Sequence, residues 1–489
     1  MDVQQLLLLA VALAVPLVLF TIGKPRLVLG WVGITLSVHI FDTTIFTNLP
    51  AARVVGLLYL PYALLTAPSW FRTAPAQIAV ISLIYLMVLG VIFGFVIPWP
   101  DTTGHRPFNM TAPGRAVVYL TRLLVDLSLT VFVAHELRKP GAIFFLARTF
   151  VLGATLSALA GLLLLVIPGF DPYFAITGLR NLNGIQFVRA RGLSFEPRGL
   201  GMACVYSLMI LIIKPVRLTF QRQWLMLINV LGMLVSYSSS SLALFAAGII
   251  TAATLLSRGM RRTIMKIVLV ASAFTLIGAL TLPQQFAIAK QTVIEHLDPT
   301  IRLRGAEPEN LGQAIAYRLD SFDASALLFL FDQPLYIFIG TGPGMMLLPA
   351  SNYVPPGLFS AMYPPERGLD GLPTHGPLLE LSNGGVITLA AWIVQIILCW
   401  RALRIVWRRQ TDPQRAQEWQ FGRGLFLIGV VFYTIQTSIT SPIWAVLLGI
   451  GWAAALLTNR QAQLSGSSAR KEVALRTEPL PSSMSGAHS

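Results

Sequence analysis

The sequence predicts an all-α, polytopic integral membrane protein with about 12 or 13 transmembrane helices and one large extramembrane loop. Apolar residues make up 55% of the 489 residues and charged residues only 12%, and the mean hydropathy is +0.69. Soluble domains carry about 25% charged residues. The apolar residues also gather in runs that, with their flanks, can cross a hydrocarbon layer of about 30 Å. These observations exclude a soluble globular protein.

The predicted spans divide the chain into four regions. They cover residues 5–22, 27–41, 54–67, 76–98, 116–135, 144–168, 199–213, 224–237, 242–256, 264–282, 377–400, 424–439 and 442–457. We therefore expect N-terminal membrane helices over 1–282, the large loop over 283–376, C-terminal membrane helices over 377–458 and a tail over 459–489. The tail is rich in serine, proline and glycine, which predicts disorder.

Lysine and arginine gather in alternate connections between the runs. Such clusters occur at residues 24–26, 138–148, 214–222, 258–266 and 401–423, and again in the tail. Because cytoplasmic connections carry an excess of basic residues, this side and the C-terminus are predicted to be cytoplasmic. The large loop then lies on the outer face. Orientation also accounts for the net charge of +15, so we expect no nucleic-acid partner.

One basic stretch falls on the outer side, where orientation gives no reason for it. Residues 187–201 read FVRARGLSFEPRGLG and lead directly into an apolar run. Its charged residues are Arg189, Arg191, Glu196 and Arg198. Pro197 suits the first turn of a helix, whose free N–H groups attract anions, and guanidinium groups bind phosphate in bidentate fashion. The stretch predicts a site for a phosphate or pyrophosphate group; the alternative is a loop that merely flanks a helix.

The large loop predicts a helical cap on the membrane region. Residues 309–331 place apolar side chains at helical spacing, and Arg318 lies off that stripe. His375 stands directly before the next run, and an imidazole there could act as a general base or make only a turn contact. Glu196 is a second candidate for the base, or an ion-pair partner that holds the neighbouring arginines.

Charged residues also occur within the runs. Arg122 and Asp126 are four residues apart and would face each other on a helix. Charges at bilayer depth cost roughly 2.5–3.5 kcal/mol each, so they should pair and face the protein interior. They predict a structural ion pair or a substrate contact, and His39 is a weaker candidate of the same kind. The sequence has no cysteine or histidine spacing typical of zinc sites, and we expect neither a metal nor another cofactor.

Four motifs follow one another around the large loop. They are Arg191-Gly192-Leu193-Ser194-Phe195-Glu196-Pro197, the serine cluster 236–241, Tyr317-Arg318 followed by Gly340-Thr341-Gly342, and residues 374–380 followed by Gly384-Gly385. Their order resembles the O-antigen ligase and polymerase superfamily of membrane glycosyltransferases. The chain departs from that pattern in the serine cluster, which lacks arginine, and at His375-Gly376, where the family often has His-Asn.

The resemblance implies a GT-C-like fold and an inverting, metal-independent transferase in the bacterial inner (cytoplasmic) membrane, with its active site and large loop on the periplasmic side. The donor would be a glycan on polyprenyl pyrophosphate. The pyrophosphate-binding residues would be Arg189, Arg191, Arg198 and Arg318. His375 or Glu196 would activate the acceptor hydroxyl.

The Phe-Glu-Pro form of the first motif is more similar to O-antigen and exopolysaccharide polymerases than to ligases. A polymerase would work with a flippase and a chain-length regulator. Three alternatives stay open: a ligase that transfers finished polymer to lipid A core or another acceptor, a peptidoglycan-type polymerase, and a transporter of lipid-linked sugars without catalysis.

Overall fold

The computed structural model describes fourteen parts of the chain. They are residues 3–39, 50–96, 111–167, 177–182, 185–194, 196–213, 220–236, 238–255, 269, 321–346, 349, 353, 376–435 and 442–477. These residues are mostly helical. Every predicted apolar run coincides with a helix except 264–282, which lies outside the described residues apart from Leu269.

The helices follow the predicted order along the chain. Those before the large loop are α1 (Val3–Thr21), α2 (Pro25–Thr35), α3 (Ala51–Leu65), α4 (Ala67–Trp70), α5 (Ala74–Val91) with the π-helical η2 (Ile92–Val96), α6 (Ala112–Leu137), α7 (Ala142–Val166), α8 (Pro197–Ile213), α9 (Phe220–Val235) and α10 (Ser239–Leu255). Those in and after it are α15 (Ser321–Asp332), α16 (Leu335–Ile339), α19 (Gly376–Arg409), α20 (Pro413–Ile435) and α21 (Ile443–Thr477).

The described helices fit a multi-pass membrane protein. Five are long and apolar enough to cross a membrane, namely Ala74–Val96, Ala112–Leu137, Ala142–Leu163, Gly376–Arg409 and Ile443–Arg460. Four more are apolar but shorter, namely Leu7–Thr21, Ala51–Leu65, Pro197–Ile213 and Ser240–Ala253. The number of full-length spans among the described residues is therefore below the predicted 12 or 13, because several predicted runs form helices of only 11 to 17 residues.

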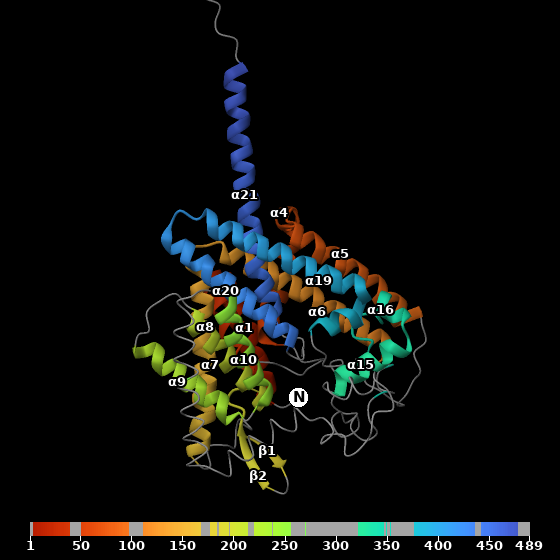
Figure 1. The fold of residues 1–489 in the computed structure, drawn as a ribbon, viewed down its shortest axis with the longest axis vertical. Coiled ribbons are helices and arrows are strands. Elements are labelled where there is room, and N and C mark those ends of the chain that lie inside the picture. The colour runs from red at the N-terminus through yellow and green to blue at the C-terminus, as the bar shows by residue number, and fades with distance from the viewer. Residues whose placement is uncertain are drawn as a thin grey trace, which may run out of the picture.

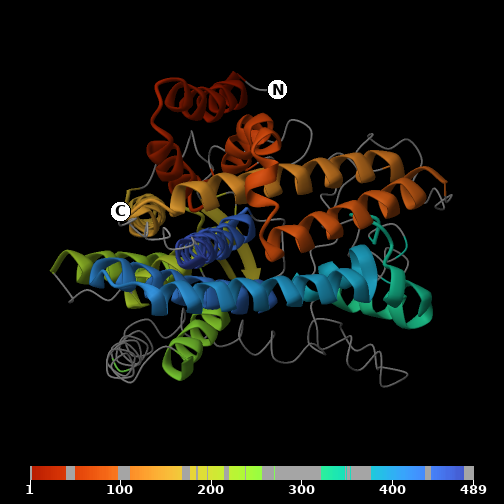
Figure 2. The same ribbon diagram turned by 90° about the horizontal axis from the view of Figure 1, so that it is seen from above.

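Long helices near the two ends of the chain pack against one another. In Figure 1, α5, α6 and α19 descend side by side, and in Figure 2 α21 is seen nearly end-on between α6 and α19. The main apolar core lies where these helices meet α3, α7, α8 and α20, and its largest fully buried side chains include Trp419, Trp452 and Phe132. The N-terminal and C-terminal helices thus form one packed body.

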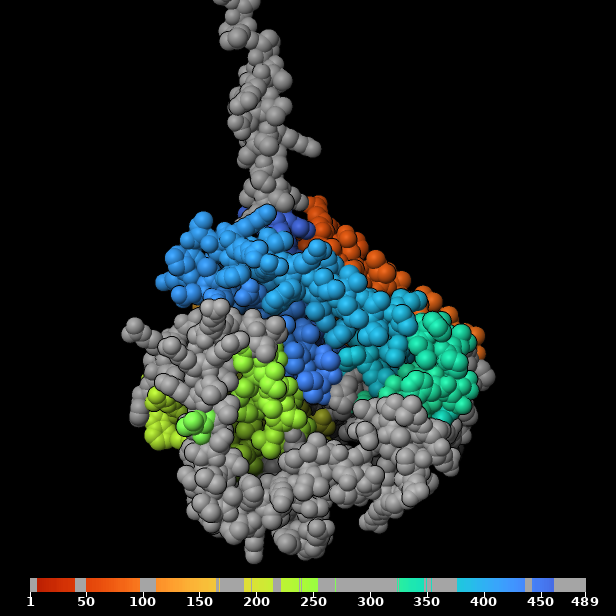
Figure 3. Space-filling model, in the orientation of Figure 1, coloured from red at the N-terminus to blue at the C-terminus, as the bar shows by residue number. Residues whose placement is uncertain are grey.

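The described part of the large loop is helical and packs on α19. Ala326, Phe329 and Leu330 of α15 form a buried cluster with Met346, against which Leu378 of α19 packs. Figure 3 shows α15 and α16, in teal, resting on the first part of α19. The predicted helix over 309–331 is helical in its described half, from Ser321 onward.

Two differences from the sequence expectations concern regular structure. Residues Thr177–Leu182 and Ile185–Ala190 form an antiparallel β-hairpin, β1 and β2, in an otherwise helical chain. Between the strands the sequence reads Asn183-Gly184, the dipeptide most typical of two-residue hairpin turns. Helix α21 also continues to Thr477, where composition predicts disorder, because its last turns are rich in alanine, arginine, lysine, glutamate and leucine, which favour helix.

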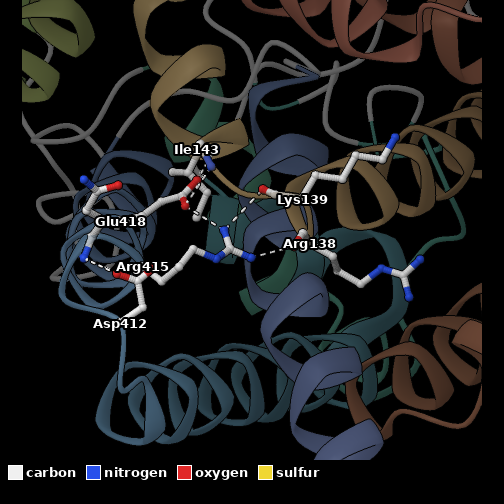
Figure 4. Close-up of polar contacts among 8 residues, drawn as sticks. Arg138, Lys139, Ile143, Asp412, Arg415 and Glu418 are labelled. Atoms are coloured by element: carbon white, nitrogen blue, oxygen red, sulfur yellow. Dashed lines mark hydrogen bonds and ion pairs between the residues drawn. The ribbon is translucent and has the colours of Figure 1, made fainter.

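The connection between α6 and α7 is held onto α20 by a buried carboxylate (Figure 4). Glu418 accepts hydrogen bonds from the backbone N–H groups of Gly141 and Ile143, both at 3.0 Å. Arg415 donates to Glu418 and to the backbone carbonyl of Arg138, both at 2.6 Å. The carboxylate therefore accepts hydrogen bonds from backbone N–H groups at the start of α7, which have no acceptor within the helix.

Candidate functional site

The basic stretch forms a turn between β2 and α8 that is fixed by hydrogen bonds to α7 and to the segment that follows α2. Gly192 has a φ of +57°, and a Cβ there would lie 2.3 Å from the backbone carbonyl oxygen of Ser157 on α7. The next residue, Leu193, donates its backbone N–H to the Ser157 Oγ at 2.9 Å. Its carbonyl accepts from the backbone N–H of His39 at 3.0 Å. Glycine is thus required for the close approach of the turn to α7.

The charged residues of the stretch differ in exposure. Arg191 and Arg198 are half-buried, whereas Glu196 is exposed. Arg189 is also half-buried and donates from Nε to the backbone carbonyl of Ser236, at 3.1 Å. The first residue of the serine cluster is therefore in direct contact with the basic stretch.

The serine cluster packs on the first turns of α8. Ser236, Ser238 and Ser241 are buried. A Cβ added to Gly201 would lie 2.3 Å from the Ser241 Oγ and 2.6 Å from the Ser236 Oγ. Gly201 therefore allows the hydroxyl groups to approach the helix backbone.

Several polar atoms beside the start of α8 are buried without a hydrogen-bond partner in the described part of the chain. They are Arg191 Nε, Ser194 Oγ and Ser241 Oγ. Ser194 lies against Gly199 and Ser241 against Gly201, both in the first turns of α8. Buried polar groups are normally paired, and a guanidinium N–H and two hydroxyls can all donate. Arg191 and Ser194 belong to the turn that leads into α8, and Ser241 packs on its first turns, so these donors and the helix N-terminus occur at the same place in the fold, a combination suited to an anion.

Of the other predicted residues, the structure brings His39 to this turn. Besides its backbone bond to Leu193, its ring lies 3.8 Å from the position of a Cβ on Gly199. Arg318 and His375 lie outside the described residues. Their convergence with the basic stretch therefore stays a prediction.

Asp126 makes an ion pair that the sequence analysis missed. Its two carboxylate oxygens accept from Nε and Nη2 of Arg53 on α3, both at 2.8 Å. Arg122, expected to face Asp126, has its guanidinium 5.3 Å from the ring centre of Tyr119. The sequence did contain a feature that could have identified Arg53 as a candidate residue. This arginine directly precedes the apolar run 54–67, on the predicted outer side.

The glycine-rich motif Gly340-Thr341-Gly342 follows α16 and packs against a break in α19. The φ and ψ angles are non-helical at Gly384 (−142°, 22°) and Gly385 (65°, −158°). The carbonyl of Ser382, freed by this break, accepts from the backbone N–H of Thr341 at 2.8 Å. The motif is therefore a tight turn that packs on α19, and no Lys-Ser/Thr pair typical of a nucleotide P-loop follows it.

Together these features define a mostly helical, multi-pass membrane protein with a donor-rich turn at the start of the apolar helix α8. Comparison of the chain with protein-family models gives no match, and comparison with curated proteins gives none either. A function for the turn therefore rests on its own residues and on the resemblance of the motifs.

Proposed function

We propose that this protein is an inverting, metal-independent membrane glycosyltransferase that polymerises polyprenyl-pyrophosphate-linked repeat units into O-antigen or exopolysaccharide at the periplasmic face. The observation that supports this proposal most is the group of donors beside the start of α8. Arg191 Nε, Ser194 Oγ and Ser241 Oγ are buried there without a partner among the described residues. A pyrophosphate offers several acceptor oxygens to such a group.

The reaction needs stabilisation of a leaving group. An acceptor hydroxyl attacks the anomeric carbon of the donor sugar, and a new C–O bond forms as the bond to the pyrophosphate oxygen breaks. The pyrophosphate leaves with that electron pair, so its negative charge grows in the transition state. Preorganised donors aimed at this charge lower the barrier. One displacement inverts the configuration at the anomeric carbon.

The residues divide into two roles. Arg191 and Arg198 contact the pyrophosphate, with Arg318 as a third contact. Arg189 holds the serine cluster in place through the Ser236 carbonyl and adds positive charge. The proton of the attacking hydroxyl passes either to Glu196, which is exposed, or to His375.

The length of the glycan that stays on the lipid separates a polymerase from a ligase. We would extract lipids from cells that lack this protein and measure the pyrophosphate-linked glycans by mass spectrometry. Accumulation of single repeat units is the expected result, because chain extension stops. Long chains on the same lipid would instead favour a ligase, which transfers finished polymer and shares the donor site.

A variant of Arg191 tests the site itself. Cells with Arg191→Ala should accumulate single repeats as the deletion does, and Arg191→Lys should restore only part of the polymer, because lysine lacks the planar guanidinium. The matched control is Arg409→Ala, at the exposed end of α19, which should leave polymer length unchanged. Normal polymer from Arg191→Ala, at wild-type protein level, would refute the site.

Transport of lipid-linked sugars without catalysis is the remaining alternative. Ion-coupled transporters use ionisable groups within the membrane, whereas Asp126 here is engaged by Arg53 in two hydrogen bonds. Purified protein in liposomes distinguishes the two. We expect extension of a labelled lipid-linked glycan, and movement of the glycan across the bilayer without extension would favour transport.

A further inference from the structure

A second candidate site lies between the long helices, and neither the basic stretch nor the serine cluster contributes to its lining. It is a cavity of about 190 Å³ lined by side chains of α3, α5, α6, α19, α20 and α21. Its lining includes Arg53 and Asp126, Glu380 and Gln395 of α19, and Tyr433 of α20. Buried polar and charged groups are costly unless they are paired, so the presence of several of them at one cavity is consistent with a ligand that has polar groups.

The cavity lining offers a phosphate few basic groups. Among the described lining residues, Arg53 and Arg122 are basic and Asp126 and Glu380 are acidic. Arg53 is bound by Asp126 through two hydrogen bonds. Arg122 is therefore the one lining arginine outside that ion pair, whereas Arg189, Arg191 and Arg198 all lie around the start of α8. The lining suits a neutral ligand with hydroxyl groups.

Three aromatic rings form one wall of the cavity. The rings of Tyr433 and Trp444 are stacked, with centroids 4.4 Å apart and an angle of 19° between their planes. The ring of Trp392 lies 5.9 Å from each of them. A sugar ring has an apolar C–H face and a polar edge of hydroxyls, so it can pack on such rings while its hydroxyls reach the carboxylates and amides.

Two indole N–H groups at the cavity lack acceptors. Trp392 and Trp452 are 9% and 1% exposed, and neither Nε1 has a hydrogen-bond partner in the described part of the chain. Buried tryptophan N–H groups usually find an acceptor. A ligand with hydroxyl or ring oxygens would supply acceptors, and the carboxylate of Glu380 and the amide oxygen of Gln395 could accept from its hydroxyls.

We propose that this cavity binds one neutral sugar ring. Its volume of about 190 Å³ is below the range of roughly 300–1,000 Å³ for drug-sized ligands, so the cavity fits one ring and not an oligosaccharide. Resting on the transferase function proposed above, the bound ring is a sugar of the acceptor glycan that lies behind the one whose hydroxyl attacks at the start of α8. The cavity then selects the acceptor, while the start of α8 binds the donor.

Saturation-transfer NMR on the purified full-length protein tests this proposal without measuring transfer. The probes are the methyl glycosides of glucose, galactose, mannose, rhamnose and N-acetylglucosamine. We expect saturation transfer to at least one of them. Trp444→Leu, which removes a ring from the wall, should abolish it. Trp392→Phe keeps an aromatic ring and removes one N–H donor. It should raise the dissociation constant of the glycoside roughly three- to ten-fold, which corresponds to the loss of one neutral hydrogen bond.

The control variant is Trp224→Leu, because Trp224 lies on α9, outside the cavity lining, and is 50% exposed. It should bind the glycoside as the wild type does. Thermal melting of every variant shows whether it is folded, and Trp392→Phe is the informative variant if Trp444→Leu is unfolded. No saturation transfer to any glycoside from folded wild-type protein would overturn the proposal, as would displacement of the sugar by inorganic pyrophosphate.

The donor-site variant separates the two proposals. Arg191→Ala should bind the glycoside with wild-type affinity, because the donor site does not line the cavity. If it binds the glycoside and also makes normal polymer, the transferase proposal fails and the sugar site stands. If wild-type protein binds no glycoside while Arg191→Ala accumulates single repeats, the cavity assignment fails and the transferase proposal stands.

Discussion

Arg53 and Asp126 form a two-pronged ion pair between α3 and α6, with Nε–Oδ1 and Nη2–Oδ2 distances of 2.8 Å. The Arg53 side chain is 2% exposed and that of Asp126 is 24% exposed. Bidentate geometry makes this among the stronger kinds of ion pair. It fixes α3 against α6, which contributes Tyr119, Arg122, Leu123, Asp126, Leu127 and Thr130 to the cavity lining.

Removal of the carboxylate alone should therefore destabilise the protein. Breaking a buried pair from one side costs about 3–5 kcal/mol, because the remaining charge stays buried. We expect Asp126→Asn to lower the melting temperature of the purified protein, measured by scanning fluorimetry. The double variant Arg53→Met/Asp126→Leu should recover part of the loss. Equal melting temperatures for Asp126→Asn and the wild type would show that the pair contributes little.

Loss of the Glu418 carboxylate should loosen the connection between α6 and α7. Glu418→Ala leaves the backbone N–H groups of Gly141 and Ile143 without their acceptor, and each orphaned buried donor costs about 1–3 kcal/mol. Asp412→Ala is the matched control, because Asp412 accepts from the exposed N–H of Gln414 and an N-cap is worth about 1 kcal/mol. Scanning fluorimetry should show the larger fall for Glu418→Ala.

An alanine at Gly385 should be incompatible with the break in α19. Its φ is +65°, and a Cβ would lie 2.1 Å from the backbone carbonyl oxygen of Phe338. Gly23 is the matched control, with a φ of +67° and no atom within 4 Å of an added Cβ. Gly23→Ala should cost only the left-handed strain of about 1–2 kcal/mol. We expect Gly385→Ala to reduce the yield of folded protein from membranes far more.

Hydropathy alone located the helices, because a run of apolar residues long enough to enter a membrane has few other structures available. It could not give their true lengths, since helix ends depend on tertiary contacts. The break at Gly384 and Gly385 illustrates this limit. The run 377–400 predicts one continuous span, whereas the backbone angles of these two glycines are non-helical, and the backbone N–H of Thr341, from a distant segment, donates to the carbonyl of Ser382 at the break.

The candidate site was predicted in part for a similar reason. Arginines on the predicted outer side of a membrane protein are conspicuous, so Arg189, Arg191 and Arg198 could be singled out from charge and the predicted topology. The contact of Arg189 with Ser236 joins segments separated by 47 positions, and the sequence analysis did not predict it. Arg53 was missed because its partner Asp126 is 73 positions away, whereas Arg122 stood one helical turn from Asp126 and seemed the natural partner.

The contact between Ser157 and Leu193 connects the stability of the turn to its proposed role. Ser157 is fully buried on α7, and its Oγ accepts the backbone N–H of Leu193 at 2.9 Å. Ser157→Ala leaves that N–H unpaired, at a cost of about 1–3 kcal/mol, and frees the backbone that positions Arg191. We expect a lower melting temperature and, in cells, shorter polymer with some accumulation of single repeats.

Ser128→Ala separates this effect from the general loss of a buried hydroxyl. Ser128 is 1% exposed on α6, and its Oγ has no hydrogen-bond partner among the described residues. Removing that hydroxyl should therefore leave the melting temperature nearly unchanged, because no partner loses its bond. Since Ser128 is remote in sequence from the basic stretch and does not line the cavity, polymer length should be unchanged as well. If the two alanine variants behave alike, the Ser157 contact does not position the arginines.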